Sequence, residues 1–105
     1  MNYHSYFRRD GRSVEVCLIG TGGFGRSLLA QARAVPGLAV RVAIDVRAET
    51  VTEAMRSAGV PEAEIRICAT AEEARSAFEA GAYVAAERFE TVCALPVDVV
   101  VEATG

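Results

Sequence analysis

Apolar residues along this chain follow two periodicities. Short runs rich in β-branched residues, bounded by glycines or polar turns, predict strands that are buried on both faces. Four such strands are predicted, over 14–19, 38–46, 65–69 and 97–101. Three helices with an apolar stripe are predicted between them, over 23–35, 47–59 and 71–80. Strands that alternate with helices in this way pair in parallel through right-handed crossovers.

Residues that start and stop helices support these boundaries. Pro36 and Gly37 are placed to end the first helix. Thr70 and Glu73 have the spacing of a capping box at the start of the third helix, and Gly81 is placed to end it.

The segment between the third helix and the last strand has a weaker pattern. Residues 83–85 are predicted as a short strand, and 87–95 as a helical turn or an irregular connection. With about four main strands, the predicted fold class is α/β, a partial Rossmann-type doubly wound parallel sheet in the usual spatial order 3-2-1-4. This domain covers 14–105, and 1–13 are assigned as a leader arm. The single histidine, His4, lies in that arm without a neighbour that would orient it for catalysis.

Size and composition predict one small folded domain. The chain has 105 residues, of which 51% are hydrophobic and 24% are charged. All eleven basic residues are arginines, so no lysine is available for a Schiff base, for acid–base catalysis or for a Walker-type phosphate site. The net charge of -3 and the scattered arginines argue against a nucleic-acid surface.

Signals for membranes, disulfides and metals are missing from the sequence. No apolar run approaches the roughly 20 residues that span a bilayer, and the N-terminus has no apolar signal-peptide core. We therefore expect no membrane association and a cytoplasmic location. Cys17, Cys68 and Cys93 lie far apart and predict neither a disulfide framework nor a metal site. Cys17 and Cys68 are expected to be small buried residues.

The most informative motif is the glycine-rich loop between the first strand and the first helix. Gly20, Gly22 and Gly25 form a GxGxxG pattern. In a dinucleotide site the first glycine allows a tight turn and the second lets the backbone approach the pyrophosphate, while the third lets helix and strand pack closely. The N-terminal N–H groups of the helix then point at the phosphates, which requires no lysine.

An acidic residue at the end of the second strand adds to this motif. Asp45 lies 20 residues after Gly25, where a carboxylate can accept both hydroxyls of an adenosine ribose. Its alternative role is the N-cap of the following helix. Asp45 favours NAD, whereas Arg47 could hold the 2′-phosphate of NADP, so the sequence leaves this choice open.

The last strand is predicted beside the first, so its end lies at the same carboxyl edge of the sheet. Ala103, Thr104 and Gly105 are small and would let a cofactor's ribose and nicotinamide pass close. Glu102 is either a polar contact at that edge or an ordinary strand-end carboxylate. The uncovered edge of this strand predicts that the isolated chain is marginally stable or associates with a second copy.

Two stretches of the sequence resemble a known family. They are VCLIGTGGFGRSLLAQARAVPGLAVRVAIDV and LPVDVVVEATG, and they are similar to the N-terminal NAD(P)-binding domain of homoserine-dehydrogenase-like oxidoreductases with a C-terminal SAF domain. This group includes enzymes like deoxyxylulose-phosphate reductoisomerase. The resemblance implies that the loop binds the pyrophosphate, that 45–47 meet the adenosine ribose and that 103–105 approach the nicotinamide. The implied cofactor-binding residues are Gly20, Thr21, Gly22, Gly23, Phe24, Gly25, Asp45, Val46, Arg47, Ala103, Thr104 and Gly105.

Members of this family are several hundred residues long, and their substrate-binding and catalytic residues follow the point where this sequence stops. The resemblance therefore implies a cofactor domain for hydride transfer to or from a small polar metabolite, with the catalytic half outside this chain. Within the chain we predict no catalytic residue and no metal ligand. Two alternatives are a module that senses NAD(H) without turnover, and a methyltransferase, whose loop usually lacks the third glycine.

Overall fold

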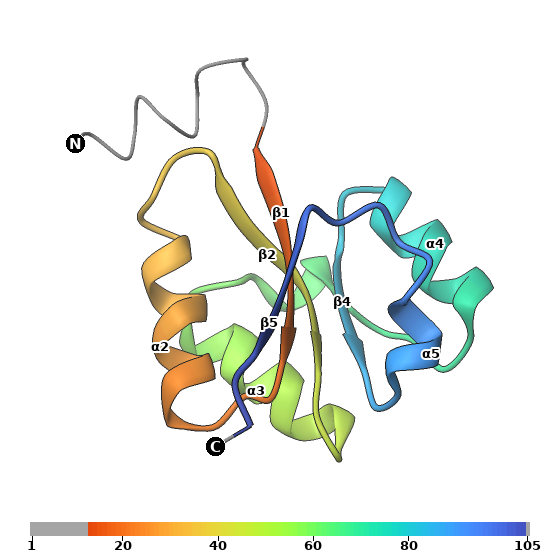
Figure 1. Ribbon diagram of the computed structural model, residues 1–105, viewed down its shortest axis with the longest axis horizontal. Helices are drawn as coiled ribbons and strands as arrows, with labels where there is room; N and C mark the ends of the chain where they lie inside the picture. Colours follow the sequence, from red (N-terminus) through yellow and green to blue (C-terminus); the bar gives the residue numbers. More distant parts are fainter. Residues whose placement is uncertain (1–12, 105) are drawn as a thin grey trace.

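A computed structural model describes residues 13–104, which form a layered α/β fold (Figure 1). The strands are β1 (Val14–Ile19), β2 (Leu38–Ile44), β3 (Ile65–Ile67), β4 (Tyr83–Ala86) and β5 (Val99–Glu102). The helices are α2 (Gly23–Ala32), α3 (Ala48–Ser57), α4 (Ala71–Glu79) and α5 (Phe89–Val92), with a short 3-10 helix, η1 (Glu62–Glu64), before β3. The predictions for 1–12, including His4, and for Gly105 concern residues outside the described part of the chain.

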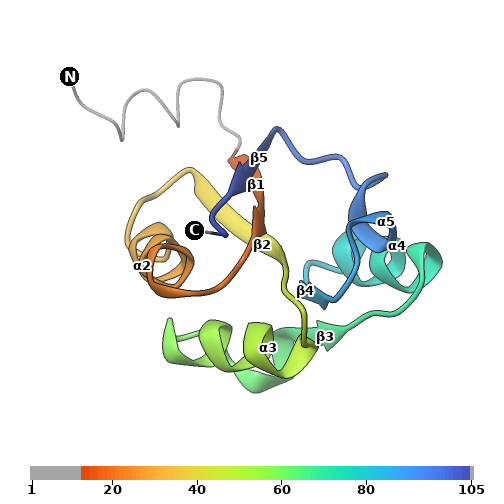
Figure 2. The same ribbon diagram turned by 60° about the horizontal axis from the view of Figure 1, so that its bottom comes forward.

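Within residues 13–104 the five strands form one parallel sheet in the order β3-β4-β2-β1-β5. Helices α2 and α3 cover one face of this sheet, and α4 and α5 cover the other (Figure 2). The predicted doubly wound, Rossmann-like α/β class is therefore confirmed.

The two faces bury separate apolar clusters. The cluster under α2 and α3 includes Val16, Leu18, Leu29, Val51 and Met55. The cluster under α4 and α5 includes Cys17, Val42, Val84, Phe78 and Val92. Neighbouring strand residues alternate between these clusters, because successive side chains of a strand point to opposite faces. This is why the central strands read as nearly continuous apolar runs, interrupted only by Glu15 in β1 and Arg41 in β2.

The predicted order 3-2-1-4, in which the fourth strand is the one observed as β5, is wrong in one half of the sheet. The last strand pairs with β1 as predicted, but β3 does not pair with β2, because β4 lies between them. Residues Val84, Ala85 and Ala86 of β4 are fully buried, whereas Arg66 and Ile67 of β3 are exposed. Burial on both faces suits an inner position, and a three-residue strand with exposed side chains suits an edge.

The direction of the crossovers explains the two helical layers. From β1 through β2 to β3 the chain moves toward one edge of the sheet, and right-handed crossovers place α2 and α3 on the same face. From β3 through β4 to β5 the chain moves back, which places α4 and α5 on the opposite face.

Most predicted ends are within a few residues of the observed ones. The capping box is confirmed, since Thr70 Oγ1 accepts from the Glu73 N–H and Glu73 Oε1 accepts from the Thr70 N–H. Helix α2 ends three residues before the predicted 35, because the Val35 N–H bonds to the Ala32 carbonyl in a tight turn. The last strand begins at Val99 instead of 97, since the Val97 N–H still bonds within a turn, to Leu95.

No helix in the described residues combines the length and the apolar character needed to cross a membrane.

Candidate functional site

The glycine loop is closely packed at its first and third glycines. Gly20 has a φ of +96°, and a Cβ added there would lie 2.7 Å from Thr104 Cγ2. A Cβ added to Gly25 would lie 2.2 Å from the Gly20 carbonyl oxygen. This geometry agrees with the tight turn predicted at Gly20 and with the close packing of helix on strand predicted at Gly25.

The middle of the loop is open. Gly22 is the N-cap of α2 and Gly23 its first residue, and a Cβ added to either would meet no atom within 4 Å. In the described residues no side chain caps this helix and no acid lies in its first turn. The Phe24 side chain is 64% exposed. The positive end of the α2 dipole thus lies at an open surface of glycine backbone, which suits an anion.

Asp45 follows β2 and turns its carboxylate toward this loop. Asp45 Oδ2 accepts from the Thr21 N–H at 2.9 Å and from Thr21 Oγ1 at 2.7 Å, while Oδ1 accepts from the Val46 N–H at 2.7 Å. The side-chain hydrogen bond from Thr21 is the main cause that holds the pKa of Asp45 below its ordinary value. The carboxylate is therefore ionised at neutral pH and held in one orientation.

Val46 and Arg47 lie beyond Asp45 with exposed side chains. The N-cap of α3 is Arg47, so the alternative N-cap role of Asp45 is wrong. The Arg47 side chain makes no cap hydrogen bond with any described residue. Arg47 Nε lies 3.7 Å from Glu49 Oε1 in an exposed pair.

The end of β5 lies against the glycine loop. The Ala103 N–H donates to the Ile19 carbonyl at 2.7 Å, and this bond continues the pairing of β5 with β1. The Thr104 N–H and hydroxyl both donate to Glu102 Oε1. These bonds, the side-chain one foremost, lower the pKa of Glu102. Glu102 is thus a strand-end carboxylate bonded to its own neighbour.

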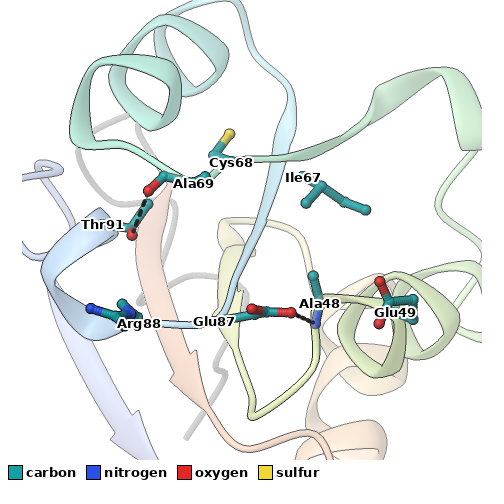
Figure 3. Close-up of a pocket in the computed structure, with 8 residues that line it drawn as sticks. All are labelled: Ala48, Glu49, Ile67, Cys68, Ala69, Glu87, Arg88 and Thr91. Carbon is teal, nitrogen blue, oxygen red and sulfur yellow. Dashed lines mark hydrogen bonds between the residues drawn. The ribbon is translucent and has the colours of Figure 1, made fainter.

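The structure also contains a pocket that the sequence reasoning missed (Figure 3). It lies at the carboxyl ends of β3 and β4 beside the start of α3, and its volume is about 210 Å³. It is lined by Ala48, Glu49, Ile67, Cys68, Ala69, Glu87, Arg88 and Thr91. Strands β2 and β4 are neighbours that lead to helices on opposite faces, so the chain diverges above them and leaves a crevice.

The pocket combines fixed polar groups with an exposed apolar side chain. Glu87 reaches across to α3, where its Oε2 accepts from the Ala48 N–H at 2.9 Å (Figure 3). On the other side, the Thr91 hydroxyl donates to the Ala69 carbonyl at 3.5 Å. Ile67 is 59% exposed. Glu87 and Arg88, which follow β4, are a polar pair in the sequence that indicates this pocket. The indication can be used only once β4 is placed next to β2.

The three cysteines lie within the described residues and are free thiols. Cys17 and Cys68 are buried, as predicted, and Cys93 is exposed. Burial raises the pKa of Cys17 to about 11 and also raises the pKa of Cys68. In the same part of the chain, no three His, Cys, Asp or Glu side chains are grouped so that they could hold a metal ion.

Comparisons with protein-family models and with curated proteins find no match to this chain. What the structure establishes is a Rossmann-like parallel α/β fold, which is compatible with nucleotide binding.

Proposed function

We propose that this chain is the NAD(P)-binding domain of an oxidoreductase of the homoserine-dehydrogenase-like type. The dinucleotide would bind along the carboxyl edge of the sheet, from the end of β5 across the glycine loop to the pocket beside α3. When bound, the cofactor would carry a hydride to or from a small polar metabolite. The residues of this chain would bind and orient the cofactor.

The observation that carries the proposal is the open backbone at the start of α2. Gly22 and Gly23 leave room for a ligand to contact the main chain, whereas Gly20 packs against Thr104 and Gly25 packs against Gly20. A pyrophosphate suits this surface, because N–H groups and a helix dipole stabilise negative charge without a lysine. A simple strand-to-helix turn would require the packed glycines but not the two open ones.

The adenosine half suits the next part of the edge. Asp45 is ionised beside the loop, and its N–H bonds to the Ala86 carbonyl at 3.2 Å, which joins the end of β2 to the end of β4. The pocket begins directly beyond this contact, at Ala48 and Glu87. Ile67, and Val46 with 84% exposure, offer apolar surface on which a flat base can lie. We therefore propose that a ribose binds at Asp45 and that the adenine lies toward the pocket.

The nicotinamide half would extend the other way, past β5. Ala103 and Thr104 lie against Gly20, and the Cβ of any residue in place of Gly20 would meet Thr104. The side chains there are small, so we propose that the nicotinamide half passes over them.

The test is a titration of the purified chain with NADH, NADPH and S-adenosylmethionine. The fluorescence of the reduced nicotinamide reports the first two ligands directly. We expect saturable binding of a nicotinamide dinucleotide. Binding of S-adenosylmethionine, with neither dinucleotide bound at millimolar concentration, would overturn the proposal in favour of a methyltransferase.

A matched pair of variants tests where the pyrophosphate binds. Gly23→Glu adds a carboxylate at the open start of α2, where the helix dipole tolerates it but a phosphate does not. We expect about a tenfold loss in affinity for both dinucleotides, equal to roughly 1.4 kcal/mol. Ala30→Glu adds the same charge on an exposed position of the same helix and should leave binding unchanged. Equal effects of the two variants would contradict the assigned position.

A further inference from the structure

The Asp45 carboxylate is already largely occupied by its own chain. A carboxylate has about four acceptor sites, two on each oxygen. Both sites on Oδ2 are used by Thr21, and one on Oδ1 is used by the Val46 N–H. Among the described residues, this leaves one site, on Oδ1. In this orientation Asp45 can accept one hydroxyl of a ribose but cannot chelate both.

Thr21 is the residue that imposes this orientation. Its side chain is 1% exposed, so it lies beneath the loop surface and cannot itself be a main contact for a ligand. Its hydroxyl donates to Asp45 at 2.7 Å, from the loop that follows β1 to the residue that follows β2. The strand ends are joined further by the Gly20 N–H, which donates to the Ile44 carbonyl at 2.8 Å. Thr21 therefore fixes Asp45 from a neighbouring strand.

The charges around the start of α3 disfavour a phosphate on the ribose. The described charged residues at this position and in the adjoining pocket are Asp45, Arg47, Glu49, Glu87 and Arg88. The carboxylates outnumber the guanidinium groups, and the exposed Arg47 has Glu49 beside it. A 2′-hydroxyl is compatible with this balance, whereas a 2′-phosphate is repelled by the fixed charge of Asp45.

We propose that Thr21 is a positioning residue that presents Oδ1 of Asp45 to the adenosine ribose and thereby makes the site select NAD(H) over NADP(H). This inference rests on the proposed function. Thr21 acts through Asp45 and touches no cofactor atom.

The experiment compares Thr21→Val and Thr21→Ser. Valine keeps the size and the β-branch but loses the hydroxyl, whereas serine keeps the hydroxyl. Dissociation constants for NADH and NADPH are measured for both variants and the wild type. We expect the wild type to prefer NADH, Thr21→Val to lose about tenfold in NADH affinity with a smaller change for NADPH, and Thr21→Ser to behave like the wild type.

Several outcomes would overturn the inference. A wild type that prefers NADPH would do so, as would an unchanged NADH affinity in Thr21→Val. An equal loss of both cofactors in that variant would mean that Thr21 only supports the loop. A wild type that binds neither dinucleotide would instead overturn the proposed function itself, so the two failures are distinguishable.

A second readout does not depend on cofactor. The carbon-13 shift of the Asp45 carboxyl group, followed by NMR against pH, gives its pKa in each protein. We expect a higher pKa in Thr21→Val than in the wild type or Thr21→Ser, because the largest stabilising hydrogen bond is gone. An unchanged pKa would overturn the inference. If Thr21→Val does not fold, Asp45→Asn replaces it in the binding assay, and an unchanged preference for NADH would overturn the inference there.

Discussion

The carboxyl edge of the sheet has two regions that are built differently. The glycine-loop region consists of Gly20 to Gly25 with Asp45, and its residues contact one another closely. Gly25 packs on Gly20, and Thr21 donates two hydrogen bonds to Asp45. The pocket region consists of Ile67 to Ala69, Glu87 to Thr91, and Ala48 with Glu49 at the start of α3. Its walls come from separate elements, and Ile67 is left exposed. The glycine-loop region is therefore held by close contacts at its two ends, whereas the pocket region is lined in part by exposed side chains.

This difference predicts which measurement each region will affect. Changes in the packed part of the glycine-loop region should alter the free energy of unfolding, because backbone and core move with them. Changes in the pocket region should alter ligand binding with little effect on stability, because few core contacts depend on its exposed residues.

The largest effect is expected from Gly25→Ala. Its Cβ would overlap the Gly20 carbonyl, a backbone atom that cannot move without disturbing β1. We expect the free energy of unfolding to fall by about 3 kcal/mol, measured by urea denaturation. Gly23→Ala is the matched control, since its Cβ would lie in open space, and it should stay within about 0.5 kcal/mol of the wild type. Similar losses in the two variants would contradict the division of the loop into packed and open glycines.

The second largest effect is expected on NADH affinity, from a substitution in the pocket region. Ile67→Ala removes apolar surface from a side chain that is 59% exposed. We expect NADH affinity to fall by roughly fivefold, about 1 kcal/mol, with stability nearly unchanged. Val99→Ala on the edge strand β5 is the control, because Val99 is 43% exposed and lies away from the pocket. Loss of stability without loss of binding in Ile67→Ala would show that the pocket region is structural.

The smallest expected effect is a pH dependence of the free energy of unfolding, caused by Asp45 in the glycine-loop region. The pKa of Asp45 is lowered in the folded protein, so its contribution to stability is fully present above the unfolded pKa of about 3.9 and is lost as the pH falls through the folded pKa. The difference in unfolding free energy between the wild type and Asp45→Asn should therefore shrink below about pH 4. Denaturation at neutral and acidic pH measures it. A difference that is independent of pH would contradict the ionised Thr21–Asp45 contact.

The same two regions show what the sequence could predict. Strand β1 has the predicted bounds. The tight turn at Gly20 and the close packing of Gly25 on Gly20 follow from a motif whose residues are close in the chain, whereas the contact of Gly20 with Thr104 joins two distant segments. The position of β5 beside β1 also follows from the usual order of the fold.

The pocket region could not be predicted because it depends on sheet order. A three-residue strand and a four-residue strand carry little periodicity, and their order is decided by which of them buries both faces. Only with β4 next to β2 do Glu87 and Ala48 come together. The Thr21–Asp45 contact could not be predicted for a different reason. Strands β1 and β2 were correctly predicted to be neighbours, but no sequence pattern specifies a side-chain rotamer.

An NMR titration of the backbone amides with NADH tests directly whether one dinucleotide binds along the carboxyl edge of the sheet. If the dinucleotide spans both regions, resonances of Gly22, Gly23 and Val46 should shift together with those of Ile67 and Ala69, with one saturation curve. Shifts confined to other surfaces of the sheet, or no shifts at millimolar NADH, would contradict binding of a dinucleotide along this edge.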